Sequence, residues 1–132
     1  MDAYLSREAY HLLLGLNLSS SKPNMDGLLI GHKRGNRFFV ENIFPTKKGF
    51  YSSLKNYFAL DEHFGGKLIG FFTYEADEKK IRKILSPFAF GQLFFDLRLT
   101  KKKKMIIKSF IIDYNQDFFL SPVDLRLPKL KA

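Results

Sequence analysis

One short segment, KLIGFFTYEADEKKI at residues 67–81, places groups that can do chemistry directly behind an apolar run. The run ends at Thr73, and Glu75, Asp77 and Glu78 follow within five residues. Carboxylates can bind hard cations such as Mg²⁺, Mn²⁺ or Ca²⁺ when they converge from more than one direction. Acidic residues also favour the first turn of a helix, where the helix dipole attracts negative charge. We expect the second role, because these carboxylates follow one another along the chain.

Other residue types used for metal binding or nucleophilic catalysis are scarce. The chain has no Cys, which excludes disulfides, thiolate zinc sites and cysteine nucleophiles. His11, His32 and His63 are far apart and lack the spacing of a zinc-binding pair on one element. The sequence GHKRG is expected to be a hairpin turn, since it does not open a helix as a phosphate-binding loop would. We therefore expect neither a metal nor another cofactor.

Basic residues outnumber acidic ones by 22 to 13, which gives a net charge of +9. This balance suits an anionic partner such as nucleic acid, although a solvated lysine-rich surface explains it equally well. Two basic clusters, one at the first expected hairpin and one near the C-terminal end, would form a phosphate-binding surface if they faced the same side. The candidate anion or nucleic-acid contacts are Lys33, Arg34, Arg37, Lys101, Lys102, Lys103 and Lys104.

The spacing of apolar residues predicts the elements that would position these side chains. Apolar residues at helical spacing predict helices at about residues 7–16 and 75–85. Residues 45–58 are expected to be a long connection that could end in a short helix. Apolar runs bounded by turn residues predict strands and hairpins. The expected strands cover residues 28–31, 37–44, 67–72, 88–100 and 105–114, with hairpin turns at 32–36 and 101–104.

The length and the order of these elements predict one domain over residues 1–132. Residues 115–132 contain Pro122 and Pro128, so we expect an edge strand or a docked extension there. We expect an α/β (α+β) fold, a mixed and mostly antiparallel β-sheet packed with two or three helices as a sandwich. The start of the chain is a poor signal peptide, and the apolar runs are far shorter than the ~20 residues of a membrane helix. A cytoplasmic protein with no membrane contact is therefore expected.

Four segments that occur in order between residues 4 and 114 suggest a family: LSREAYHLLL, GLLIGHKRGNRFFVENIFP, FALDEHF and GKLIGFFTY. Their combination resembles the MPN domain, the fold of the JAMM zinc metalloproteases that remove ubiquitin-like modifiers. The likeness covers most of the chain. It implies an MPN-like (cytidine-deaminase-like) sandwich.

The residues that active members use for catalysis are missing from this chain. In those members a His-Ser-His-Pro motif and an Asp of the next helix hold zinc, and a Glu seven residues before a strand-ending glycine acts as the base. Here the position of that Glu is Asn24, and the motif reads Thr-Tyr-Glu-Ala at residues 73–76. An amide cannot act as the base, and both imidazoles are gone. The resemblance therefore implies an inactive member without zinc, whose degenerate positions are Asn24, Thr73 and Glu75.

Three functions stay open from the sequence. The first is a non-catalytic MPN-like scaffold that binds a protein partner or self-associates through apolar surface, its former zinc cleft filled by Phe and Tyr side chains. The alternative is a small basic nucleic-acid-binding protein that uses the lysine-rich C-terminal hairpin. The third is a hydrolase with a rearranged metal site.

Overall fold

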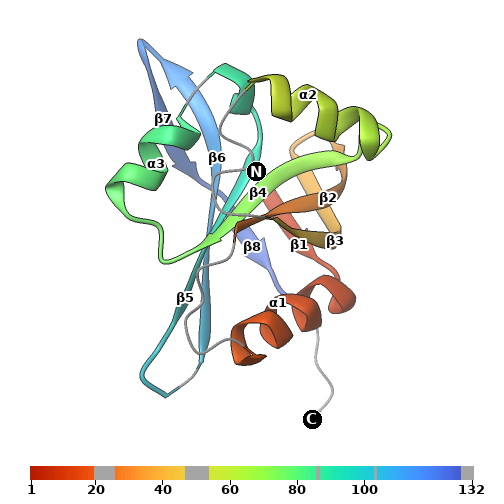
Figure 1. Ribbon diagram of the computed structural model, residues 1–132, viewed down its shortest axis with the longest axis vertical. Coiled ribbons are helices and arrows are strands. Elements are labelled where there is room, and N and C mark those ends of the chain that lie inside the picture. The colour runs from red at the N-terminus through yellow and green to blue at the C-terminus, as the bar shows by residue number, and fades with distance from the viewer. Residues whose placement is uncertain (20–25, 47–53, 86, 103, 129–132) are drawn as a thin grey trace.

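A computed structural model describes residues 1–19, 26–46, 54–85, 87–102 and 104–128 (Figure 1). Its elements are eight strands, three α-helices and one 3₁₀ turn. In chain order they are β1 (Asp2–Leu5), α1 (Arg7–Ser19), β2 (Asp26–Arg34), β3 (Arg37–Thr46), α2 (Leu54–His63), β4 (Leu68–Tyr74), α3 (Glu78–Ile84), η1 (Pro87–Ala89), β5 (Leu93–Leu99), β6 (Met105–Asn115), β7 (Asp117–Pro122) and β8 (Asp124–Arg126).

All eight strands belong to one curved sheet with the order β7-β6-β5-β4-β2-β3-β1-β8. The first and last strands of this order, β7 and β8, are separated in the chain by Val123 alone. The Val123 amide donates to the Ser109 carbonyl of β6 at 2.9 Å, and the next amide, that of Asp124, donates to the Met1 carbonyl beside β1 at 3.2 Å. One continuous stretch of chain therefore lies against β6 on one side and β1 on the other. The sheet curls into a barrel-like shape.

The expected α/β sandwich, with helices packed on a sheet, is wrong. The described chain is mostly β, a barrel-like mixed sheet with three short helices. The spacing of apolar residues shows which segments are strands, but it does not show that the two ends of the chain pair with each other. Within residues 115–132, β7 pairs with β6 and β8 pairs with β1, whereas residues 129–132 lie outside the described part.

Several local predictions are confirmed. Both hairpins form, β2 with β3 and β5 with β6, and Gly35 in the first turn has a φ of 56°. Helices α1 and α3 form close to the expected positions. The sequence did not predict β1, and α2 is longer than the short helix expected at the end of the 45–58 connection, of which residues 47–53 are not described. In the described parts of the chain, no helix is both long and apolar enough to cross a membrane.

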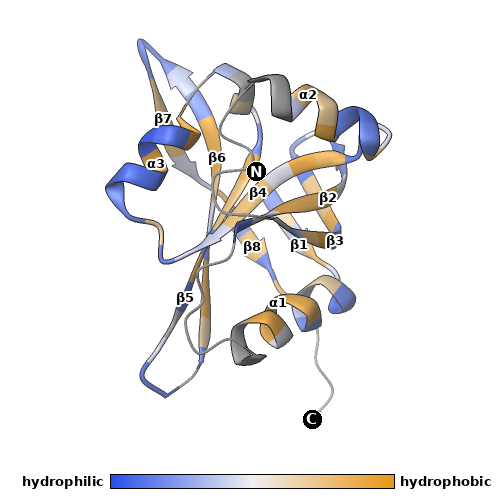
Figure 2. Cartoon of the chain, viewed as in Figure 1, coloured by the Kyte–Doolittle hydropathy of each residue, from blue (hydrophilic) through white to orange (hydrophobic). Residues whose placement is uncertain are grey.

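The core has two apolar clusters, one on each face of the central strands. Figure 2 shows the hydrophobic residues concentrated along these strands. Ala9 and Leu13 of α1 belong to the first cluster, and Ile84 of α3 belongs to the second, together with partly buried side chains of α2. Neighbouring Phe71 and Phe72 of β4 point into opposite clusters, and every residue of β4 is buried. This explains why β4 reads as a continuous apolar run instead of an alternating one.

One close approach in the sheet requires glycine. β4 pairs with β5 in parallel, and Gly70 lies opposite Leu93. A Cβ at Gly70 would lie 2.1 Å from the Leu93 carbonyl oxygen, closer than any non-bonded contact allows. The short distance between these central strands therefore depends on the missing side chain.

Helix α1 is tied to the barrel by a hydrogen bond from Tyr74. The Tyr74 hydroxyl, at the end of β4, donates to the Leu13 carbonyl of α1 at 2.9 Å in a buried position. Burial raises the pKa of Tyr74 to about 12. The phenol therefore stays neutral, and able to donate, well above the ~10 of an exposed tyrosine.

We expect the substitution Tyr74→Phe to lower the free energy of unfolding by about 1 kcal/mol at neutral pH, because it removes one buried hydrogen bond. The folded-state pKa of Tyr74 is raised, so its contribution is complete below pH ~10 and is lost as the pH rises toward 12. Denaturant titrations of both proteins from pH 8 to pH 12 check this. A wild-type advantage that does not shrink above pH ~10 would contradict the role of the phenol proton.

Candidate functional site

The acidic segment forms the turn between β4 and α3. Glu75 is exposed and has a φ of 51°, in the left-handed region that favours glycine, and its amide donates to the Leu97 carbonyl at 2.7 Å. Asp77 is the N-cap of α3, and its side chain accepts a hydrogen bond from the Lys80 amide at 2.8 Å. Glu78 lies in the first turn. Asp77 and Glu78 thus serve the start of the helix, as the sequence predicted.

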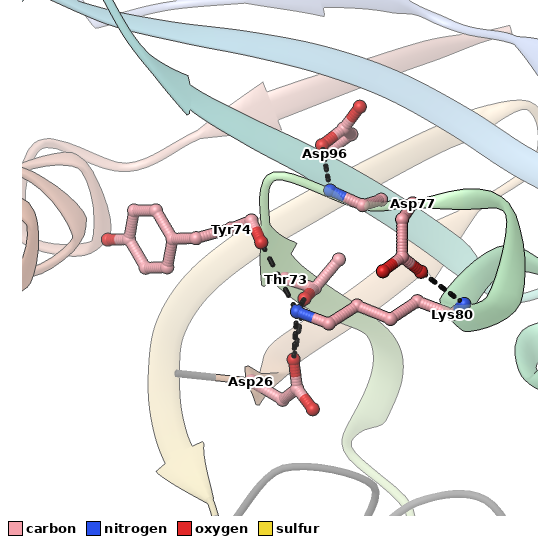
Figure 3. A network of polar contacts seen from close by, with 7 residues as sticks. Asp26, Thr73, Tyr74, Asp77, Lys80 and Asp96 are labelled. Carbon is pink, nitrogen blue, oxygen red and sulfur yellow. Dashed lines mark hydrogen bonds and ion pairs between the residues drawn. The ribbon is translucent and has the colours of Figure 1, made fainter. Parts of the chain in front are cut away.

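A buried carboxylate lies beside this turn (Figure 3). Asp26, the first residue of β2, is 1% exposed and pairs with Thr73 of β4. The Thr73 hydroxyl donates to Asp26 Oδ1 at 2.5 Å. Lys80 of α3 extends toward the same oxygen, with Nζ at 3.9 Å, and donates to Thr73 Oγ1 at 3.2 Å and to the Tyr74 carbonyl at 3.3 Å. We call Asp26, Thr73 and Lys80 the Asp26 network.

A second carboxylate fixes the backbone of the same turn. Asp96 of β5 is 6% exposed, and its Oδ1 accepts from the Ala76 amide at 3.1 Å (Figure 3). Its Oδ2 accepts from Arg98 Nε at 3.3 Å, and Arg98 Nη2 donates to the Ala76 carbonyl at 3.1 Å. The turn is therefore held from β5 as well as from α3, and both carboxylates have partners.

In the Asp26 network, the ammonium group of Lys80 offsets the negative charge of Asp26, as a bound cation would. The side chain of Lys80 is 13% exposed and that of Asp26 only 2%, so their opposite charges offset each other away from water. A divalent ion would have to displace Lys80 to reach Asp26. Among the residues that the structure describes, no three His, Cys, Asp or Glu side chains are grouped so as to hold a metal ion.

The three degenerate positions have different surroundings. Asn24 lies outside the described residues. Thr73 is fully buried within the Asp26 network, whereas Glu75 is exposed and its amide bonds to the Leu97 carbonyl of β5.

Sequence reasoning missed Asp26, Lys80 and Asp96. One signal was available, because Asp26 and Asp96 are charges within or beside strongly apolar strands, where a carboxylate needs a partner. The identity of that partner could not be read from the sequence. Lys80 lies on α3, and the sequence does not show which strand this helix packs against.

The three histidines lie on three different elements. His11 is exposed on α1, and His63 ends α2 with its ring edge-on to that of Phe64. His32 of β2 contacts Glu41 of β3 through Nδ1 at 2.5 Å and stacks on a neighbouring aromatic ring. Nothing in the described structure joins them as ligands of one metal.

The two basic clusters lie at opposite ends of the sheet. Lys33, Arg34 and Arg37 surround the turn at the C-terminal end of β2. The lysines at 101, 102 and 104 follow the C-terminal end of β5, at the lower left of Figure 1, and Lys103 is not described. β4 is antiparallel to β2 and parallel to β5, so these two C-terminal ends point in opposite directions. The clusters do not combine into one phosphate-binding surface.

An apolar hollow of about 270 Å³ lies where the chain after α3 meets the end of the β6–β7 hairpin. Its lining residues are Pro87, Phe90, Tyr114 and Phe118, and we call it the Phe90 hollow. Phe90 is 55% exposed and Tyr114 is 54% exposed, and the rings of Tyr114 and Phe118 lie 4.8 Å apart. Two large aromatic side chains left in water beside a hollow are typical of a contact surface.

Comparison with known proteins supports the fold and goes no further. No protein-family model matches the sequence, and no curated protein matches it either. The structure is similar to the solution structure of protein DSY2949 from Desulfitobacterium hafniense, with a TM-score of 0.65 and 16% sequence identity. The match covers 96% of this chain and 94% of that one. At this identity the likeness shows a shared fold over almost the whole of both chains.

Proposed function

We propose that this chain is a non-catalytic protein-interaction domain that works in the cytoplasm. The observation that supports it best is the Asp26 network, because Thr73, a position where the resemblance implies a zinc-binding histidine in active members, is hydrogen-bonded to the ammonium group of Lys80. Breaking a buried ion pair by removing one partner costs several kcal/mol. The network therefore acts as a structural connection between β2, β4 and α3.

The partner that fits best is an acidic protein with an exposed apolar side chain. The Phe90 hollow offers the apolar contact, since Phe90 and Tyr114 are about half exposed. The net charge of +9 attracts an acidic surface at long range and disfavours contact between two copies of this chain. Association with a different protein is therefore favoured over self-association.

The alternative functions have less support. Nucleic-acid binding is favoured by the net charge, but the two basic hairpins point in opposite directions along the sheet. A hydrolase with a rearranged metal site would have to move Lys80 away from Asp26.

We expect Thr73→Val, which keeps the shape of the side chain, to lower the free energy of unfolding by about 1–3 kcal/mol, since Asp26 loses the hydroxyl donor. Lys80→Met is expected to cost about 3–5 kcal/mol, because a buried carboxylate is left without its cation. Denaturant titrations at pH 7 measure both changes.

The matched control for Lys80→Met is the neighbouring substitution Lys79→Met, at an exposed position of the same helix. We expect this variant to stay within about 0.5 kcal/mol of the wild type. Equal effects of the two substitutions would mean that the loss comes from the helix or the net charge, and the structural role of the Asp26 network would be rejected.

The non-catalytic part of the proposal is checked with Zn²⁺ and Mn²⁺ titrations followed by calorimetry, and with hydrolysis assays on an isopeptide-linked ubiquitin-like substrate. We expect no saturable metal binding near the turn and no hydrolysis above background. The thermal melting temperature should not change on addition of EDTA. Stoichiometric metal, or activity that EDTA removes, would establish the hydrolase alternative.

The interaction part is checked with Phe90→Ser, and with Ile106→Ser at the far end of β6 as the matched control. Phe90 is 55% exposed and Ile106 is 45% exposed, so both substitutions remove a large apolar side chain from the surface. Proteins captured from the source cells are identified, purified and titrated against each variant. We expect Phe90→Ser to weaken binding of an acidic partner at least about tenfold and Ile106→Ser to leave it unchanged. Equal affinities for the wild type and Phe90→Ser would reject this surface.

A further inference from the structure

A second hollow, of about 400 Å³, lies at the end of the sheet opposite to the Asp26 network. β2 and β4 stay together at the start of β4, where the Gly31 amide donates to the Lys67 carbonyl at 2.9 Å, whereas pairing between β4 and β5 starts only at Gly70. β4 and β5 therefore separate where β4 begins. The residues that line this Lys67 hollow are Gly31, His32, Lys33, Phe38, Gly66, Lys67, Leu68, Ile69, Gly91 and Gln92.

The charged groups of the Lys67 hollow are basic. Lys33 and Lys67 come from β2 and from the residue before β4, and among the described residues no acidic side chain lines the hollow. Lys33 Nζ lies 5.1 Å from the centre of the Phe38 ring, so it is held at the wall by a cation–π contact. Across the described residues, neither lysine forms an ion pair with an acidic side chain. His32 adds little net charge, since Glu41 contacts its Nδ1.

The remaining walls suit the body of an organic molecule. Phe38, Leu68 and Ile69 are apolar, and no side chain of Gly66 or Gly91 narrows the space. Gln92 lines the same hollow, and its Nε2 donates to the Tyr57 hydroxyl at 3.0 Å. Burial, and then the charge of Asp61, raise the pKa of Tyr57, so this phenol is neutral and anchors the amide.

We propose that the Lys67 hollow binds a small organic phosphate, with Lys33 and Lys67 on the phosphate and the apolar walls around the organic body. Its volume falls in the range of about 300–1,000 Å³ that is typical of small-molecule sites. Two ammonium groups beside walls of low polarity bind a phosphate more strongly than they would in open water. The Phe90 hollow shares none of the lining residues of this site, although Phe90 and Gly91 are consecutive in the chain.

Adenosine monophosphate is the probe, since it carries one phosphate and a flat aromatic base whose faces can pack on apolar walls. We expect Lys33→Ala/Lys67→Ala to weaken its binding at least about tenfold, because charge-assisted hydrogen bonds are lost. The matched control is Lys101→Ala/Lys102→Ala, which removes the same charge from the opposite end of the sheet and is expected to change the affinity less than about twofold. Calorimetry gives the affinities, and circular dichroism confirms that both variants are folded.

Nuclear magnetic resonance adds a readout that does not depend on any variant. Titration of the wild type with adenosine monophosphate should shift the amide signals of Gly31, Gly66 and Gly91 and leave those of Lys101 and Lys102 in place. Adenosine and inorganic phosphate serve as partial ligands, and each is expected to bind at least about tenfold more weakly than the whole nucleotide.

Three results would overturn the proposal. The first is no saturable binding of adenosine monophosphate up to about 5 mM. The second is equal weakening by the two double substitutions, which would mean general attraction by a basic protein. The third is an affinity for inorganic phosphate equal to that for the nucleotide, since the walls of the hollow would then contribute nothing.

Discussion

The way the elements pack around β4 depends on one constraint, which is that the buried carboxylate of Asp26 must have a partner. Asp26 is almost completely removed from water, where an unpaired negative charge would be very costly. Its hydrogen bond with Thr73 joins β2 to β4 at one register, and its attraction for Lys80 brings α3 against the same strand. The turn between β4 and α3 is also fixed from β5, because Asp96 accepts a hydrogen bond from the Ala76 amide.

The same interaction governs what the site can do. In a metalloprotease, carboxylates and imidazoles converge on a metal ion that activates a bound water molecule. Here an ammonium group on a flexible stem provides the positive charge, and it donates hydrogen bonds instead of accepting ligands. An ammonium group cannot activate a water molecule as a metal does. This difference favours the proposal of an interaction domain. The surfaces proposed for binding are then the two hollows, and not the turn.

The sequence predicted local structure better than long-range structure. The hairpins β2–β3 and β5–β6 and the helices α1 and α3 depend on turn residues, caps and apolar spacing within short segments, and these were predicted correctly. The fold class was wrong, because the barrel depends on pairing of β8 with β1, between segments that are far apart in the chain. The candidate site shows the same difference between local and long-range contacts. The helix-starting role of Asp77 is local and was predicted, whereas the contact of Lys80 with Asp26 crosses three elements and was not.

The pairing of β8 with β1 also has a consequence for synthesis. Asp2 is made more than a hundred residues before Asp124, and its strand gains its second neighbour only when Asp124 is available. Contacts between segments so distant in sequence form late, and they make folding slower. The chain loses the entropy of the long loop before the strand pairing stabilises it. Until residues 117–126 emerge from the ribosome, the outer edges of β1 and β6 are open to other strands. A chain stalled shortly before that point would expose both edges, and this protein should depend most on chaperones in that interval.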